Sequence, residues 1–260
     1  MPRFSANIST LFREVPLIER VGLAAAAGFD AIEIQFPYDQ DPAVLRAELE
    51  AHGLPLVLIN FPVGDLMSGG EGLAAVPGRQ AEFEQALSEA RRFAEVLRPA
   101  SMNLLAGKPD PRHDRAQCRA VFESSLRKAD LLTRELGIQL LTEPVNTIDQ
   151  ADFFLSTEQQ ALAIIDAMPD IDLRIQYDLY HMQMMGSDPI TSLPGVINQV
   201  GHIQFSDLPG RTQPGLGTID FEQIFRLIDS LDYRGYVGAE YFPTVATSAT
   251  LDWLEPYRQN

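Results

Sequence analysis

Short apolar runs with a preference for β structure recur along the whole chain, and segments with helical spacing lie between them. The runs predict eight strands, at residues 3–7, 31–36, 55–60, 101–105, 139–143, 174–178, 201–205 and 236–241. The helical segments cover residues 16–27, 42–52, 79–97, 115–136, 156–168, 190–200 and 221–231. The runs are nearly continuous in apolar character, which is typical of a parallel sheet that is covered on both faces.

A regular alternation of strand and helix can close into a barrel or stay open as a doubly wound sheet. No G-x-G-x-x-G motif follows the first run, which argues against an open dinucleotide-binding sheet. Eight units in 260 residues fit a (β/α)8 barrel, for which about 250 residues are typical. Since no linker-like segment divides the chain, we predict an α/β fold with one (β/α)8 TIM barrel domain over residues 1–260.

Acidic residues outnumber basic residues by 36 to 20, so the formal net charge is −16. A surface of that sign repels the phosphates of nucleic acids and of anionic membranes, and we expect neither as a partner. The sequence contains no run near the ~20 apolar residues of a membrane span and no signal-peptide pattern, which predicts a cytoplasmic protein. The single cysteine, Cys118, allows no internal disulfide and falls in a helical pattern as an inert residue.

In a barrel of this kind the active site lies at the carboxyl ends of the strands, so polar residues that end the apolar runs are the candidates. These residues are Asn7, Glu33, Gln35, Asn60, Asn103, Glu143, Asp178, His181, Gln204, Asp207 and Glu240. A carboxylate in such a position is buried, and buried carboxylates have to be paired or bind a cation.

Four of these residues end the fifth to eighth runs and offer oxygen only: Glu143, Asp178, Gln204 and Glu240. Oxygen ligands favour Mg²⁺ or Mn²⁺ over Zn²⁺, which prefers nitrogen and sulfur. We therefore predict that the four side chains hold one divalent cation. The alternative is that each acid pairs with a nearby Arg, Lys or backbone N–H.

Two histidines lie near these strand ends. His181 follows Asp178 by three residues and is expected to donate to a substrate oxygen or to orient a ligand. His202 precedes Gln204 by two residues, so it lies deeper on the same side of the strand. At that depth a packed, hydrogen-bonded histidine and a functional histidine are equally compatible with the sequence.

The glycine-rich connection at residues 64–78 is long for a simple loop, and we expect it to cover the active site. No H-E-x-x-H, G-x-S-x-G or P-loop motif occurs.

Several motifs together resemble hydroxypyruvate isomerase, a family of the xylose-isomerase-like barrels. They are TEPVN at residues 142–146, YDLYH at 177–181, GHIQFSDLPGR at 201–211 and GAEY at 238–241. The loop at residues 64–78 also resembles the glycine-rich segment of those isomerases, although no arginine stands between Glu71 and Gly72. Related ketose epimerases usually carry histidine at the position of Gln204, so Gln204 favours the isomerases.

The resemblance implies isomerisation of hydroxypyruvate to tartronate semialdehyde through an enediolate, assisted by Mg²⁺ or Mn²⁺. It implies that Glu143, Asp178, Gln204 and Glu240 are the metal ligands, and that Glu143 and Glu240 transfer the proton. His181 and Arg211 are implied as substrate contacts. An anionic substrate in so acidic a protein needs a cationic anchor, which Arg211 and Lys108 could provide. The remaining expected substrate contacts are Asn7, Asn60 and Glu71.

Other functions remain open at this stage. A 2-oxo-tetronate isomerase or a ketose 3-epimerase would use the same barrel and the same chemistry on another substrate. A metal-dependent endonuclease would need several histidines and a basic groove, whereas the chain has 4 histidines and a net charge of −16. A binding protein without activity is disfavoured by the intact Glu143 and Glu240. The sequence does not determine the oligomeric state: a homo-oligomer is possible, but no helix face is apolar enough to require one.

Overall fold

Eight parallel strands pair in chain order, and the last strand pairs with the first, so the sheet closes into a barrel in this computed structural model. The structure describes residues 1–257. The strands are β1 (Arg3–Asn7), β2 (Ala31–Ile34), β3 (Leu56–Asn60), β4 (Ser101–Asn103), β5 (Gln139–Thr142), β6 (Leu173–Asp178), β7 (Val200–Phe205) and β8 (Tyr236–Ala239). The predicted (β/α)8 fold class is confirmed.

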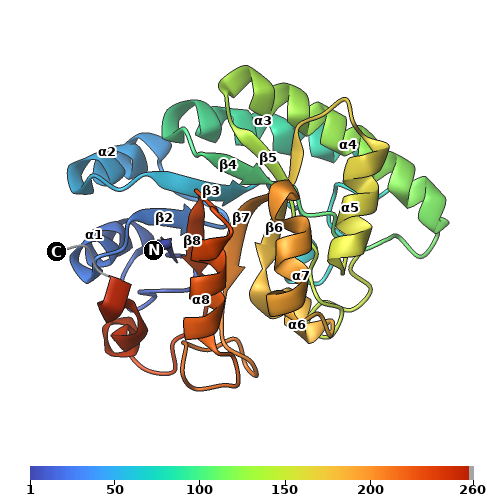
Figure 1. Cartoon of the computed structure of the whole chain (residues 1–260). Coiled ribbons are helices and arrows are strands. Elements are labelled where there is room, and N and C mark those ends of the chain that lie inside the picture. The colour runs from blue at the N-terminus through green and yellow to red at the C-terminus, as the bar shows by residue number, and fades with distance from the viewer. Residues whose placement is uncertain (258–260) are drawn as a thin grey trace.

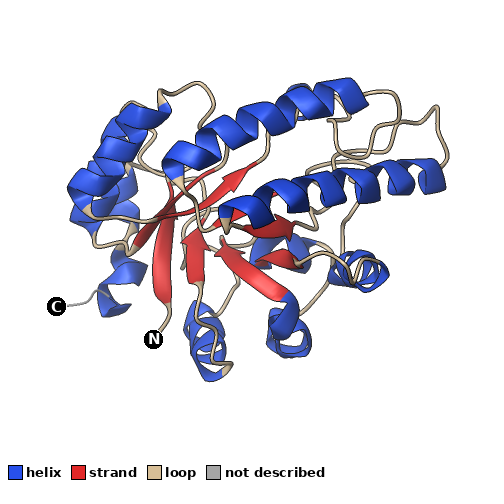
Figure 2. Cartoon of the chain, turned by 90° about the horizontal axis from the view of Figure 1, so that it is seen from above, coloured by secondary structure: helices blue, strands red, loops and turns tan. Residues whose placement is uncertain are grey.

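The helices form a layer around the strands (Figures 1 and 2). They are α1 (Leu17–Ala27), α2 (Pro42–His52), α3 (Gln80–Leu97), α4 (Arg115–Leu136), α5 (Glu158–Ala167), α6 (Leu179–Met184), α7 (Pro189–Val196) and α8 (Phe221–Ser230). Four 3-10 segments accompany them: η1 (Leu66–Ser68), η2 (Ile197–Gln199), η3 (Thr247–Thr250) and η4 (Asp252–Tyr257). Neither α6 nor the two C-terminal 3-10 segments were among the elements predicted from the sequence.

Local sequence signals explain where the longest helix begins and ends. Asp114 accepts a hydrogen bond from the backbone N–H of Gln117, and the Gln117 side chain accepts one from the Asp114 backbone, which forms a capping box before α4. Gly137 ends the helix with φ 70°, a conformation that glycine adopts without strain. Cys118 is fully buried on the inner face of α4, as expected of a structural cysteine.

Burial on both faces accounts for the apolar strands. All five residues of β3 are buried, because one face contacts the barrel interior and the other contacts the helices. Four strands, β2, β4, β5 and β8, end earlier than predicted. Glu143 and Glu240 therefore directly follow β5 and β8 instead of lying inside them. The chain leaves the sheet there to form the mouth of the barrel, which places both carboxylates at its rim.

An aromatic cluster attaches the C-terminal segment to the barrel. The ring of Phe4 on β1 packs edge-on against Phe225 of α8 and Trp253 of η4, with centroid distances of 4.9 and 5.3 Å. Burying rings of this size contributes strongly to the stability of the fold, and edge-to-face pairs add about 0.5–1.5 kcal/mol each.

Among the described residues, no helix is both long and apolar enough to span a membrane.

Candidate active site

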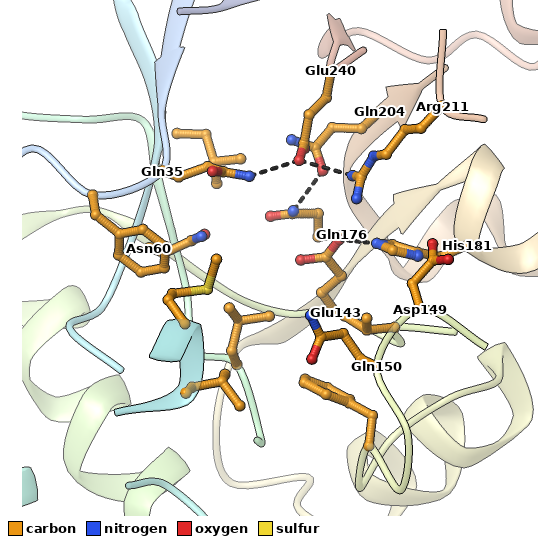
Figure 3. A pocket seen from close by; sticks show the side chains of 17 residues that line it. Gln35, Asn60, Glu143, Asp149, Gln150, Gln176, His181, Gln204, Arg211 and Glu240 are labelled. Atoms are coloured by element: carbon orange, nitrogen blue, oxygen red, sulfur yellow. Dashed lines mark hydrogen bonds and ion pairs between the residues drawn. The ribbon is translucent and has the colours of Figure 1, made fainter. Parts of the chain in front are cut away.

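The carboxyl ends of the strands surround a cavity of about 670 Å³, a volume that includes the space open to solvent at its mouth. One wall is polar and carries Glu143, Gln204, Arg211 and Glu240 (Figure 3). The other wall is mostly apolar, and Leu66, Met67, Leu105, Val145 and Phe153 are among its residues. Since Leu66 and Met67 belong to the loop at residues 64–78, part of that loop lines the cavity.

Parallel register brings the predicted ligands to one level of the barrel. Asp178 on β6 is paired with Gln204 on β7, and Gln204 is paired with Gly238 on β8. Glu240 lies just beyond this level, and Glu143 follows the end of β5. Asp178 is fully buried and is not among the residues that line the cavity.

Arg211 joins two of these acids. Its Nη2 donates to Asp178 Oδ2 at 2.9 Å and to Glu240 Oε1 at 2.8 Å. Burial would lower the pKa of the Arg211 guanidinium, but the facing charges of Glu240 and Asp178 outweigh burial and raise that pKa above its ordinary value. The guanidinium also lies over the ring of Tyr180, 5.2 Å from its centroid. Arg211 is therefore charged and held in place among carboxylates.

The loop that carries Arg211 is organised by Asp207, the second residue after β7. The Asp207 carboxylate accepts hydrogen bonds from the backbone N–H groups of Leu208, Gly215, Gly217 and Ile219. The Arg211 carbonyl accepts from the Phe242 N–H at 2.8 Å, which ties the loop to the chain after β8. Arg211 itself has φ 55°, an uncommon conformation for a residue with a side chain.

Glu143 and Glu240 have strongly perturbed acidity. Burial raises the pKa of Glu143 well above its ordinary value, and the charges of Glu240 and Asp178 raise it further. Burial likewise raises the pKa of Glu240 to about 7, although Arg211 acts in the opposite direction. Both side chains are anchored through one oxygen: Glu143 Oε2 accepts from Asn103 at 2.9 Å, and Glu240 Oε1 accepts from Gln35 at 2.7 Å. Carboxyl groups with a pKa near the working pH are suited to proton transfer.

His181 has one tautomer dictated by its neighbours. Its Nδ1 lies 3.4 Å from the backbone N–H of Asn146 and 2.7 Å from the Asn146 side-chain Nδ2. The backbone N–H groups of Ile148 and Asp149 both donate to Asn146 Oδ1. The atom of Asn146 that faces His181 is therefore the amide nitrogen, Nδ2. Because both partners donate, Nδ1 has to accept, and the ring proton lies on Nε2.

The proton on Nε2 decides what His181 can do. Nε2 lies 3.8 Å from Glu143 Oε1 and 3.6 Å from Asp178 Oδ2. Burial lowers the pKa of His181 to about 4, so the ring is neutral near pH 7. The side chain therefore presents one N–H toward the carboxylates, as a hydrogen-bond donor of the kind expected from the sequence.

The donor set fits a divalent cation. Ligand atoms of Glu143, Asp178 and His181 all lie within 4.8 Å of one another, close enough to hold a metal ion. With every group ionised, Glu143, Asp178 and Glu240 carry three negative charges against the one positive charge of Arg211. A buried excess of two negative charges is unfavourable unless a cation or protons neutralise it. In the tautomer that Asn146 imposes, His181 Nε2 carries a proton and has no lone pair for a cation, so the ligands of this group are the carboxylates of Glu143 and Asp178.

Gln204, the fourth predicted ligand, is nearly fully buried and lines the cavity. Its Oε1 accepts from Gln176 Nε2 at 2.6 Å. The other oxygen of this pair, Gln176 Oε1, is buried and has no partner among the described residues. Gln176 was not among the predicted site residues, although it precedes Asp178 by two positions and a strand period of two places it on the same side.

The predicted substrate contacts divide into two groups. Asn60, His181 and Arg211 line the cavity. Asn7 does not line it; the side chain is fully buried and its Oδ1 accepts from the Ser9 N–H at 3.1 Å. Lys108 and Glu71 do not line it either.

Lys108 and Glu71 instead lie beside a second, open cavity together with Arg115 and Asp152. The backbone N–H of Lys108 donates to the Glu71 carbonyl at 2.8 Å, which explains why these two residues lie together. Phe153 lines both cavities and stands between them. The sequence alone does not reveal this separation, because it depends on how two long loops fold over the barrel mouth.

Comparison with known proteins gives three consistent similarities. Residues 21–257 match the family model described as xylose isomerase-like TIM barrel. The chain is 38% identical over 257 residues to the 2-oxo-tetronate isomerase of Cupriavidus necator, covering 99% of each protein. It is 39% identical over 258 residues to the hydroxypyruvate isomerase of Escherichia coli, covering 99% of this chain and 100% of that protein.

Solved structures agree on the architecture. A crystal structure from Brucella melitensis, described as an AP endonuclease of family 2, superposes with a TM-score of 0.95 at 36% identity and covers 100% of both chains. The D-allulose 3-epimerase of Methylomonas sp. in complex with D-allulose superposes with a TM-score of 0.74 at 20% identity, covering 99% of this chain and 91% of the epimerase. At that identity, the likeness to the epimerase concerns the fold alone.

Proposed function

The chain belongs to the xylose isomerase-like TIM barrel family and is an isomerase like its relatives, and we propose that it converts hydroxypyruvate to tartronate semialdehyde with a bound Mg²⁺ or Mn²⁺. The observation that carries this proposal is the position of Glu143 and Glu240 at one cavity, both with a raised pKa. Two such groups are what a proton transfer between adjacent carbons requires.

The reaction moves two protons and changes no overall composition. One proton leaves the terminal carbon of hydroxypyruvate and one is delivered to the central carbon, while the hydroxyl proton moves from the terminal oxygen to the central oxygen. The intermediate is an enediolate, whose negative charge needs stabilisation. A bound divalent cation would supply a Lewis acid that polarises the carbonyl and stabilises this charge, and Glu143, Asp178, Gln204 and Glu240 would hold it.

Glu143 and Glu240 are the proposed acid and base. They follow strands that stand three apart in a ring of eight, so they face the cavity from different sides. Asn103 anchors one oxygen of Glu143, and Gln35 anchors one oxygen of Glu240. The second oxygen of each carboxyl group can therefore face the substrate. Because the reaction is reversible, the residue that acts as base in one direction acts as acid in the other. Each such group typically contributes about 10²–10⁴ in rate.

His181 and Arg211 have the donors to orient the substrate. The Nε2–H of neutral His181 points toward the space between Glu143 and Asp178, where it would donate to a substrate oxygen. Arg211 is the cationic residue among those that line the described cavity, so it is the proposed anchor for the substrate carboxylate. Asn60 adds a polar side chain on the same cavity.

Isomerisation of a 2-oxo-tetronate is the second candidate. It is supported by a relative of that name at 38% identity over 99% of the chain, against 39% for the hydroxypyruvate isomerase over the same share of the chain. The two reactions share the oxo-acid group and the proton transfer. They differ in substrate length, which depends on the apolar wall that includes Leu66 and Met67.

An endonuclease activity has weaker support. The Brucella melitensis structure carries that description, but this chain has a net charge of −16 and 4 histidines. Binding of a DNA backbone requires a basic surface that neutralises several phosphates. We therefore propose a small-molecule substrate and no nucleic-acid partner.

The test is turnover by the purified protein, followed by proton NMR in deuterium oxide. Hydroxypyruvate, a 2-oxo-tetronate, a free ketose and DNA with an abasic site are each incubated with the protein and Mg²⁺ or Mn²⁺. Conversion of hydroxypyruvate with deuterium incorporation at the new C–H bond supports the proposal. Conversion of the four-carbon acid alone would transfer the assignment to the second candidate, and cleavage of the DNA with no isomerisation would overturn both.

A further inference from the structure

Glu33 on β2 is fully buried inside the barrel and does not line the described cavity, although its place at a strand end suggested a residue of the mouth. Its Oε1 accepts from Ser5 Oγ at 2.5 Å and lies 2.7 Å from His202 Nε2. Its Oε2 accepts from Gln204 Nε2 at 2.8 Å. A Cβ atom at residue 238 would come within 1.9 Å of Glu33 Oε1, so Gly238 makes room for this carboxylate.

The hydrogen bonds around Glu33 have a fixed direction. A carboxylate accepts hydrogen bonds and donates none, so His202 has to carry its proton on Nε2 and Gln204 has to present its NH₂ group. The Gln204 amide can turn by 180° with little change in shape, which would exchange its oxygen and its nitrogen. With the nitrogen held by Glu33, Oε1 points away from Glu33, to the side where Gln176 Nε2 donates to it at 2.6 Å.

Only one of these two orientations provides a metal ligand. An amide oxygen has lone pairs for Mg²⁺ or Mn²⁺, whereas an NH₂ group offers the cation nothing. We propose that Glu33 is a positioning residue that holds the Gln204 amide with its oxygen toward the carboxylates of the site. The inference rests on the proposed function, because it assigns Glu33 a role toward the cation that the proposed function places there.

His202 and Ser5 determine which atom of residue 33 faces Gln204. Both hold Oε1, so in a Glu33→Gln variant the single amide oxygen stays with them and the new NH₂ group faces residue 204. Two NH₂ groups cannot face each other favourably. Gln204 then turns over, accepts from the new amide with its oxygen, and presents NH₂ to the site.

The experiment measures binding of Mn²⁺ alone by calorimetry and by electron paramagnetic resonance of free Mn²⁺, without substrate or turnover. We expect E33Q to raise the Kd for Mn²⁺ about 10- to 100-fold, the usual effect of losing a group that orients a ligand. E158Q is the matched control, since Glu158 is also a buried glutamate, and its hydrogen bonds go to Ser187 and Gln159. E158Q is expected to bind Mn²⁺ like the wild type.

A reversed pair provides the second arm. In Q204E two carboxylates face each other. In E33Q/Q204E the amide introduced on β2 donates through its NH₂ group to the carboxylate introduced on β7, whose oxygens both suit the cation. The double variant should therefore be more stable to urea than Q204E and should bind Mn²⁺ more tightly than E33Q. The stability comparison with Q204E does not require E33Q, so it remains decisive if E33Q alone fails to fold.

The possible outcomes are distinct. If the wild type binds no Mn²⁺, the cation of the proposed function is wrong. If the wild type binds Mn²⁺ and E33Q binds it with the same Kd, the role of Glu33 is wrong while the proposed function stands. The role of Glu33 is also overturned if E33Q/Q204E is no more stable than Q204E.

Discussion

One nitrogen of Arg211 contacts both Asp178 and Glu240: Nη2 lies 2.9 Å from Asp178 Oδ2 and 2.8 Å from Glu240 Oε1. The contact connects the loop after β7 to the ends of β6 and β8, residues separated by 33 and 29 positions in the chain. It places one positive charge directly against two of the four predicted metal ligands. The proposed metal site and the proposed substrate anchor are therefore parts of one electrostatic cluster.

Replacing Arg211 should impair the enzyme even if the fold is kept. Hydrogen bonds to charged groups are worth about 1.5–3 kcal/mol, so we expect R211M to lower kcat/KM by about 10- to 150-fold. R211K keeps the charge without the planar fork and should show an intermediate loss. Because Arg211 lowers the pKa of Glu240, the R211M pH–rate profile should also shift upward. Steady-state kinetics between pH 5 and pH 9 measure both effects, and a wild-type profile for R211M would contradict the assignment.

Removing either proposed proton-transfer group should leave a folded, inactive protein. Glutamine is close in shape to glutamate but cannot take a proton, and each positioned acid or base contributes about 10²–10⁴ in rate. We expect E143Q and E240Q each to retain well under a tenth of wild-type turnover, with circular dichroism unchanged. Deuterium exchange into the substrate, followed by NMR, reports proton abstraction separately from complete turnover. A variant that kept more than a tenth of the activity would remove that glutamate from the mechanism.

The acidity of Glu240 predicts how stability depends on pH. Its pKa is about 7 in the folded chain because of burial, against an ordinary value of 4.5. Between pH 4.5 and pH 7 the folded state therefore binds more protons than the unfolded state. The contribution of Glu240 to the unfolding free energy is fully present below pH 4.5 and is lost as the pH rises through 7. His181 acts oppositely, since its folded pKa is about 4 against 6.5, so its contribution is lost as the pH falls through that window.

Comparison with E240Q separates the two groups, because His181 is present in both proteins. In chelator, the unfolding free energy of E240Q relative to the wild type should increase by about 3 kcal/mol from pH 5 to pH 8, the equivalent of a shift of 2 to 3 pKa units. Urea titrations at the two pH values measure it. A relative stability that does not change with pH would show that Glu240 has an ordinary pKa.

Metal removal should affect both activity and stability. Dialysis against EDTA is expected to abolish turnover, and Mg²⁺ or Mn²⁺ should restore it. A ligand that binds only the folded state at 100 times its Kd stabilises by about 2.7 kcal/mol, which raises Tm by roughly 5–10 °C in a chain of this size. Differential scanning fluorimetry checks the shift, with K⁺ at equal ionic strength as the control. Full activity after exhaustive chelation would exclude a required cation.

Asp207 should control both the stability of the Arg211 loop and substrate affinity. Its carboxylate accepts four backbone N–H groups, whereas an amide at that position brings an NH₂ group against donors. We expect D207N to cost about 1–3 kcal/mol in unfolding free energy for each buried donor that is left unsatisfied, and to raise KM more than it lowers kcat. D220N is the matched control, since Asp220 caps α8 through a single bond to Gln223 and Asn caps equally well. Equal KM values for D207N and D220N would refute the role of Asp207.

The sequence by itself determined the barrel and the level at which the candidate oxygen donors lie. This follows because strand and helix periodicities are local, and because parallel strands bring their carboxyl ends to one edge wherever the loops go. The positions of Glu143, Asp178, Gln204 and Glu240 at the strand ends could therefore be predicted from the sequence, and so could that of His181, while their roles stay predictions.

Only the tertiary structure decided how those groups are oriented and which neighbours they have. The tautomer of His181 depends on Asn146, 35 residues away, and the amide of Gln204 depends on Glu33, 171 residues away. Lys108 and Glu71 were placed beside another cavity by the folding of two loops. Such contacts arise from closure of the barrel and from loop conformation. The physical reason is that hydrogen-bond direction depends on positions in space, which no spacing along a chain encodes.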